Sequence, residues 1–107
     1  MKSKKYSLAL TTQDMLDLVL IWEQRGLLTK FALNYRAYIN GKWYEVYRVD
    51  NYHGFLHEQK FWRSPEPIPI KHKEGLDLRF ILDEYQDEII DNYKKYRSYF
   101  EKTQENE

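Results

Sequence analysis

The chain contains no cysteine, only four glycines and three prolines, and no excess of either charge. Without cysteine, a disulfide framework, a thiolate nucleophile and a zinc–cysteine site are excluded. Its 17 basic residues balance its 17 acidic residues, so nucleic-acid binding would depend on a local basic patch. The longest apolar run, Leu18 to Trp22, is far shorter than the roughly 20 residues that span a bilayer. Phosphate-binding glycine motifs and a Gly-x-Ser-x-Gly elbow are also lacking, which argues against nucleotide-cofactor enzymes and serine hydrolases.

The residues that are present suit a single core. The chain has 107 residues, of which 42% are hydrophobic and 17% aromatic, and a chain of this size can bury about two-thirds of its surface. We therefore predict one domain over 1–107, folded over 6–102, with mobile tails at 1–5 and 103–107. The start of the chain has no apolar stretch of signal-peptide length. These features predict a soluble cytoplasmic protein with no membrane partner and no cofactor.

The most specific local feature is Asn40-Gly41, which stands between two runs of alternating apolar residues. Asn-Gly at such a place favours a two-residue type I′ hairpin turn. An uninterrupted register then follows from the turn. It pairs Ile39 with Lys42, Tyr38 with Trp43, Ala37 with Tyr44, Arg36 with Glu45, Tyr35 with Val46, Asn34 with Tyr47, Leu33 with Arg48 and Phe31 with Asp50.

A second hairpin is expected at Arg25-Gly26, although Arg-Gly is a poorer turn and a one-residue slip or a longer loop stays open. The two hairpins together place one set of apolar side chains on the same face of the sheet. This set is Leu16, Leu18, Leu20, Trp22, Phe31, Leu33, Tyr35, Tyr44 and Val46.

The rest of the chain completes an α+β prediction: a four-stranded antiparallel meander with one long C-terminal helix packed on one face. The fourth strand is expected at 55–62, after which Pro65, Pro67 and Pro69 should prevent regular pairing. Residues 76–102 repeat in steps of three and four, which predicts a helix that covers the apolar face. The segment 11–15 fits either a strand or a short helical turn.

A helix this long is expected to extend beyond so small a sheet. Tyr96, Tyr99 and Phe100 would then be partly uncovered, and exposed apolar patches of this kind usually mark interfaces. A homodimer formed through the C-terminal helix is the resulting prediction.

One segment carries residues that could do chemistry. Arg48 and Asp50 fall on the predicted apolar face, where a charge costs several kcal/mol unless it is paired. His53 and His57 follow within a tight bend. An ion pair with a turn-capping aspartate is the structural explanation, and convergence on one catalytic pocket is the functional one.

Three chemistries could use this segment. A metal could be held by Asp50, His53 and His57, but four residues of extended strand separate the histidines by about 13 Å unless the chain bends. Metal-independent phosphodiester cleavage would use a histidine base, a histidine or tyrosine acid, and an arginine on the phosphate. The third interpretation is a recognition surface without catalysis, made of Arg48, His57, Trp62 and Arg63. A basic patch, in which His72 joins Arg63, could also meet a phosphate backbone.

The segments Phe31 to Trp43 and Val49 to His57 resemble a small family of uncharacterised prokaryotic proteins with an Arg-x-Asp-x-x-His-Gly-Phe-x-His motif. They are also distantly similar to the TumE-type toxins of toxin–antitoxin pairs, over residues 18–62. There, Arg48-Val-Asp-Asn matches an Arg-Tyr-Asp-Asn segment, and His53 and His57 take the place of adjacent histidines. The resemblance implies action on RNA or translation.

Two functions therefore stay open. The first is an RNA-directed, endoribonuclease-type activity in which His53 and His57 transfer protons, Asp50 orients a ring, and Arg48 contacts phosphate or holds Asp50. Both histidine rings are expected outside the core, so their loss should leave folding intact. The alternative is an interaction module for an antitoxin-like protein. It would bind through three aromatic residues on the uncovered sheet face, Tyr38, Trp43 and Tyr47.

Overall fold

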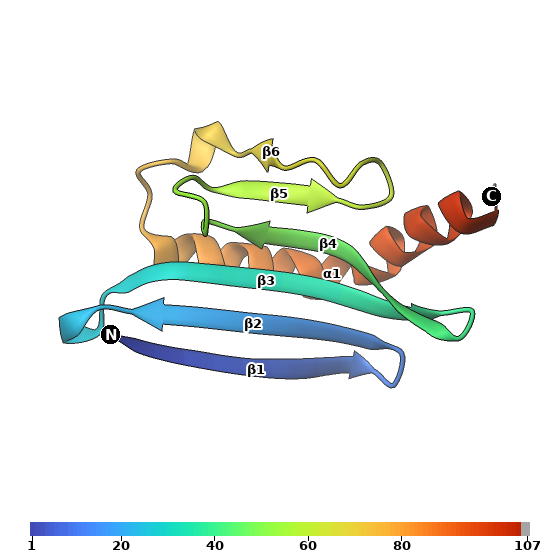
Figure 1. Cartoon of the computed structure of the whole chain (residues 1–107), viewed down its shortest axis with the longest axis horizontal. Coiled ribbons are helices and arrows are strands. Elements are labelled where there is room, and N and C mark those ends of the chain that lie inside the picture. Colours follow the sequence, from blue (N-terminus) through green and yellow to red (C-terminus); the bar gives the residue numbers. More distant parts are fainter. Residues whose placement is uncertain (106–107) are drawn as a thin grey trace.

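The computed structural model describes residues 1–105, which form one antiparallel sheet with a long helix across one face (Figure 1). The six strands are hydrogen-bonded in chain order. They are β1 (Lys2–Thr11), β2 (Asp14–Trp22), β3 (Leu28–Ile39), β4 (Lys42–Asp50), β5 (His57–Lys60) and β6 (Ile68–Pro69), and the helix α1 spans Leu78–Glu105. Two short 3-10 helices, η1 (Gln24–Gly26) and η2 (Lys71–Lys73), lie in the connections. The predicted fold class is confirmed, but the predicted number of four strands is wrong.

The two additional strands lie at the edges of the sheet. β1 pairs along its length with β2, and the alternation of Tyr6, Leu8 and Leu10 on its inner face is a signal that the sequence already contained. β6 is a two-residue pairing with β5, made within the proline-rich segment where no regular pairing was expected. Residues 2–5 belong to β1 and residues 103–105 to α1, and 106–107 lie outside the described residues. The mobility of the two ends stays a prediction. The segment 11–15 is a strand–turn–strand connection.

The β3–β4 hairpin has the predicted turn. Asn40 and Gly41 both have positive φ, at 52° and 86°, and the first four residue pairs match the prediction. A β-bulge then interrupts the register, because Arg36 pairs with Glu45 whereas the next residue of β3, Tyr35, pairs with Tyr47. The remaining predicted pairs of this hairpin are wrong. A one-residue insertion reverses which side chains face the core.

The β2–β3 hairpin has the predicted register at Leu16, Leu18 and Leu20 with a longer turn than two residues. The apolar face is confirmed over its central part, where side chains are nearly inaccessible. These buried residues are Leu16, Leu18, Leu20, Phe31, Leu33, Tyr35 and Val46.

The helix packs on this face, mainly over β3 and β4 (Figure 1). Ile89 is fully buried at the middle of the helix, and the Tyr93 ring meets Tyr35 edge to face. At the far end, Phe100 is buried against Tyr44, with ring centroids 5.3 Å apart. The strands of the β3–β4 hairpin thus cover part of the surface that motivated a homodimer, which stays a prediction. Among the described residues, α1 is too polar to cross a membrane and no other helix is long enough.

A buried ionic contact ties α1 to the β1–β2 turn. Asp14 accepts hydrogen bonds from Thr11, from the Tyr35 hydroxyl at 2.5 Å and from Arg97 at 3.0 Å. Burial by itself would raise the pKa of Asp14, but these three donors outweigh it and hold the pKa below its ordinary value. Arg97 also donates to the Tyr38 carbonyl oxygen at 2.7 Å. The contact therefore fixes the second half of the helix on the sheet.

Candidate functional site

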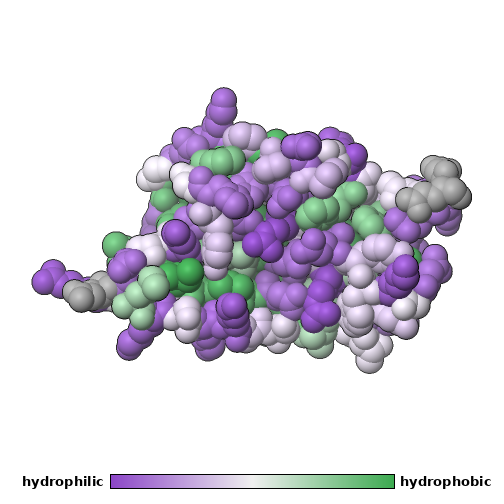
Figure 2. Space-filling model, in the orientation of Figure 1, coloured by the Kyte–Doolittle hydropathy of each residue, from purple (hydrophilic) through white to green (hydrophobic). Residues whose placement is uncertain are grey.

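The bulge at Val46 decides where the charged residues of β4 lie. Beyond it, Tyr47 and Val49 face the helix, so Arg48 and Asp50 lie on the opposite face of the sheet, which we call the open face. The prediction that both charges lie on the leucine face is wrong. Figure 2 views the open face, which is largely hydrophilic with a few separate apolar areas.

Asp50 is nevertheless buried, with only 2% of its surface exposed. Its carboxylate accepts a hydrogen bond of 2.6 Å from Arg48 Nε and one of 3.0 Å from the Tyr52 backbone N–H. The Nε2 atom of His57, which is opposite Asp50 on β5, lies 3.3 Å from Oδ1. A buried carboxylate is stable only when it is paired and hydrogen-bonded in this way. Arg48 makes this contact through Nε, and its two terminal amino groups have no hydrogen-bond partner among the described side chains and backbone groups.

His57 is the other buried member of this group, with 1% exposure. One ring nitrogen faces Asp50, and the other lies 3.4 Å from the carbonyl oxygen of Phe55. Both neighbours are acceptors, so no nitrogen of this ring is directed to solvent. The geometry therefore suits His57 to holding Asp50 and not to exchanging a proton with a substrate.

His53, the other histidine of this segment, is exposed. Its ring stacks on His57 with centroids 5.8 Å apart, and the half-exposed Phe55 covers His57 from the same bend. Gly54 has a φ of 85°, the left-handed conformation that lets the chain fold back and bring the two histidines together. Arg48, Asp50, His53 and His57, which we call the Arg48 cluster, thus lie together, with the two histidines in different environments. The ion pair of Arg48 with Asp50 and the capping of the turn by Asp50 are the contacts of the structural explanation, and a catalytic role for the cluster stays a prediction.

Tyr52 adds a phenol to the same surface. Burial raises the pKa of Tyr52 above its ordinary value, and the charge of Asp50 adds to this while that of Arg48 opposes it. The sequence prediction named a tyrosine only as a type of acid and did not single out this residue. Its position directly after Asp50 and Asn51 in the bend was the available signal.

Other predicted groupings are not formed. Within residues 1–105, no three histidine, aspartate or glutamate side chains are arranged as metal ligands, so Asp50, His53 and His57 make no such set. The predicted recognition surface of Arg48, His57, Trp62 and Arg63 is divided between the two faces of the sheet. Trp62 and Arg63 line a groove on the helix side, whereas Arg48 and His57 lie on the open face. Tyr47 is buried on the helix side and does not belong to the open face.

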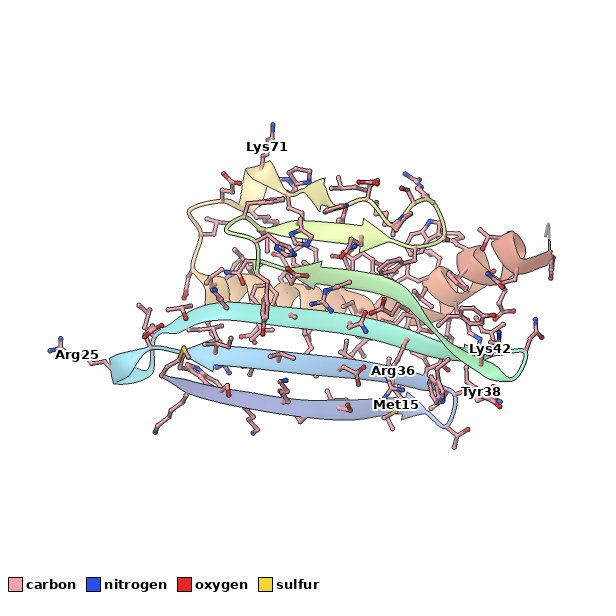
Figure 3. The ribbon with its side chains drawn as sticks, in the orientation of Figure 1. Met15, Arg25, Arg36, Tyr38, Lys42 and Lys71 are labelled. Carbon is pink, nitrogen blue, oxygen red and sulfur yellow. The ribbon has the colours of Figure 1, made fainter. Side chains whose placement is uncertain are left out.

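Tyr38 and Trp43 do lie on the open face. Their rings are 5.4 Å apart, and the Arg36 guanidinium stacks on Trp43 at 4.8 Å. Figure 3 shows Arg36 and Tyr38 on the part of β3 that leads to the turn of the β3–β4 hairpin. Trp43 is 42% exposed, so this end of the sheet presents an aromatic surface.

The groove, which the sequence did not reveal, has a volume of about 880 Å³ and lies between α1, β5 and η2. Its lining comes from four separate segments of the chain, at Tyr47, 58–63, 72–73 and 84–102, which is why no single motif marks it. We call it the aromatic groove. It is lined by Tyr47, Glu58, Lys60, Trp62, Arg63, His72, Lys73, Glu84, Tyr85, Glu88, Asn92, Lys95, Tyr96, Tyr99 and Lys102.

Comparison with known protein families identifies the class. A family described as a domain of unknown function, DUF7718, matches residues 1–106, and the chain belongs to this family. Comparisons with curated proteins and with solved structures give no match.

Proposed function

We propose that the protein is an RNA-directed protein of the endoribonuclease type, with the Arg48 cluster as its site. The observation that supports this best is the buried Asp50 carboxylate, which holds Arg48 through Nε and leaves its terminal amino groups without a partner in the described part of the chain, so that they could bind a phosphate. Buried charges of this kind are costly and often occur where a site needs a fixed cation. The resemblance to TumE-type toxins points to the same substrate class.

The cleavage would be a transesterification within RNA. The ribose 2′-oxygen bonds to phosphorus while the bond from phosphorus to the 5′-oxygen breaks. His53 takes the 2′-hydroxyl proton, and the Tyr52 phenol, which is protonated at neutral pH as tyrosines ordinarily are, gives a proton to the leaving 5′-oxygen. Arg48 binds the phosphate, whose negative charge grows in the transition state. Asp50 and His57 position Arg48. After the products leave, water takes the proton from His53 and supplies one to Tyr52, which restores both groups.

The experiment is single-stranded RNA cleavage in excess EDTA. His53→Ala should lower the rate by about 10²–10⁴-fold, as expected for loss of a general base. Tyr52→Phe should also lower it, whereas Lys42→Ala, at the exposed tip of the β3–β4 hairpin (Figure 3), should not. RNA with a 2′-deoxy residue at the cleavage position should resist. No cleavage by the wild type, or equal cleavage by the wild type and the His53 variant, would contradict the proposal.

A second candidate is a non-catalytic module that binds an antitoxin-like protein. The observation in its favour is the exposed pair of Tyr38 and Trp43 with Arg36 stacked on it, since tyrosine, tryptophan and arginine are enriched in interface hot spots. The product of the neighbouring gene is the partner to test. Loss of its binding in Trp43→Ala but not in His53→Ala would favour this function, and the reverse would favour the Arg48 cluster.

A further inference from the structure

The aromatic groove is lined by five aromatic rings, four of which contact one another. Trp62 stacks on Tyr96 with centroids 5.3 Å apart and an interplanar angle of 18°, and Tyr99 meets the same indole at 5.5 Å. Below them, Tyr47 lies 5.0 Å from Tyr96. Tyr99 is 39% exposed, so the stack reaches the surface at the helix. A row of rings in an open groove offers flat faces to a flat ligand.

The carboxylates in the groove already have partners. Glu58 accepts a hydrogen bond of 2.6 Å from the Tyr47 hydroxyl, and Glu84 is paired with Lys73. Glu88 accepts from the Tyr96 hydroxyl at 3.3 Å. Burial, with the neighbouring glutamates adding to it, raises the pKa of Tyr85 to about 12, so this phenol in the groove keeps its proton.

The cations in the groove are in excess. Arg63 and Lys95 line it and make no salt bridge with any of the described residues. His72 also lines it, so the basic patch expected around Arg63 and His72 does form here. The protein as a whole carries no net charge, yet this groove combines stacked rings with unpaired positive charge. A ligand of complementary chemistry has flat rings joined by negative groups.

We propose that the aromatic groove binds single-stranded RNA, with bases against Trp62 and Tyr99 and phosphates on Arg63 and Lys95. The choice of RNA rests on the proposed function. The groove lies on the helix side of the sheet, whereas the Arg48 cluster lies on the open face, so the groove is a second and separate contact. The groove would contribute to the affinity for the RNA strand without taking part in its cleavage.

The test uses a 2′-O-methyl oligouridylate of about ten nucleotides, within the size range of known single-strand sites. This probe cannot be cleaved by 2′-oxygen attack, so binding is measured independently of catalysis. Fluorescence of Trp62 should be quenched on titration, and the change should be absent in Trp62→Phe. Tyr99→Ala should weaken binding by about five- to 100-fold, the loss of one stacked base.

The charge contribution is read from the salt dependence. Arg63→Gln and Lys95→Gln should each lower the slope of log affinity against log salt by about 0.7, the value for one phosphate contact to a single strand. Matched controls are Arg25→Gln and Lys71→Gln, whose side chains project away from the body of the protein (Figure 3) and should leave the slope unchanged.

Two results would overturn the proposal. One is equal affinity for heparin or oligoglutamate, because binding would then need only negative charge and no rings. The other is unchanged affinity in Tyr99→Ala together with unchanged salt slopes in the Arg63 and Lys95 variants. If the probe binds as expected but RNA is not cleaved, the groove proposal stands and the cleavage proposal fails. If RNA is cleaved but the probe does not bind in the groove, the cleavage proposal stands and the groove proposal fails.

Discussion

The two histidines of the Arg48 cluster should respond very differently to truncation. His57→Ala removes a buried ring that has 1% exposure and faces acceptors at both nitrogens. His53→Ala removes an exposed ring whose structural contact is a stack on His57. The sequence alone suggested that both variants would fold equally well. The structure predicts that only His53→Ala will retain the stability of the wild type.

The loss in His57→Ala has two sources. A cavity remains where the ring was, and the buried Asp50 carboxylate loses the polar contact that His57 Nε2 makes at 3.3 Å. Together these should lower the free energy of unfolding by about 3 kcal/mol, out of the roughly 5–15 kcal/mol typical of a small domain. His53→Ala should change it by less than about 0.5 kcal/mol, as surface substitutions usually do.

Urea denaturation followed by circular dichroism measures both variants under the same conditions. With a slope of about 1–3 kcal/mol per molar urea, the His57→Ala midpoint should fall by about 1–3 M and the His53→Ala midpoint should stay near that of the wild type. His57→Gln is a useful second variant, because it fills part of the space and keeps a hydrogen-bond donor. Equal midpoints for the two alanine variants would show that the buried contact of His57 with Asp50 does not stabilise the fold.

Three further predictions concern the frame of the fold. Because the pKa of Asp14 is lower in the folded protein, this residue stabilises the fold above the unfolded pKa of about 3.9, and the stabilisation is lost as the pH falls through the folded pKa. The free energy of unfolding should therefore fall less between about pH 5 and about pH 3 in Asp14→Asn than in the wild type. Gly41→Ala should cost about 1–2 kcal/mol in thermal unfolding through backbone strain alone, since φ is positive there and an added Cβ meets no atom within 4 Å. Phe100→Ala should lower the free energy of unfolding by about 3 kcal/mol, because its packing on Tyr44 is lost. Calorimetry should give the same decrease at every protein concentration. A decrease that grows with protein concentration would indicate that a second copy of the protein covers this residue.

Local signals in the sequence determined much of the architecture. Asn40-Gly41 is a turn whose backbone conformation only a few residue types tolerate, so the hairpin and its first pairs could be predicted. The register of β2 against β3 followed from the alternation of leucines, and the helix from its period of three and four. The same alternation in Tyr6, Leu8 and Leu10 would have located β1, because a strand needs no other local signature.

No local pattern in the sequence predicts the bulge in β4. Val46 and Tyr47 are adjacent apolar residues, and both are buried, so alternation allows either one to face the helix. In the structure Tyr47 faces the helix, where its hydroxyl donates a hydrogen bond to Glu58 and its ring contacts Tyr96. That choice depends on partners from β5 and α1, which are distant in the sequence.

The sequence predicted which residues form the Arg48 cluster but not how they are arranged on the sheet. The spacing of Arg48, Asp50, His53 and His57 indicated that they could meet, and they do. Which face they occupy, and which histidine is buried, depended on one inserted residue and on the pairing of β4 with β5. The aromatic groove depended even more on tertiary structure, because its walls come from β4, β5, η2 and α1. Sequence patterns report what neighbours along a strand or helix require, whereas a groove between elements exists only after packing has brought them together.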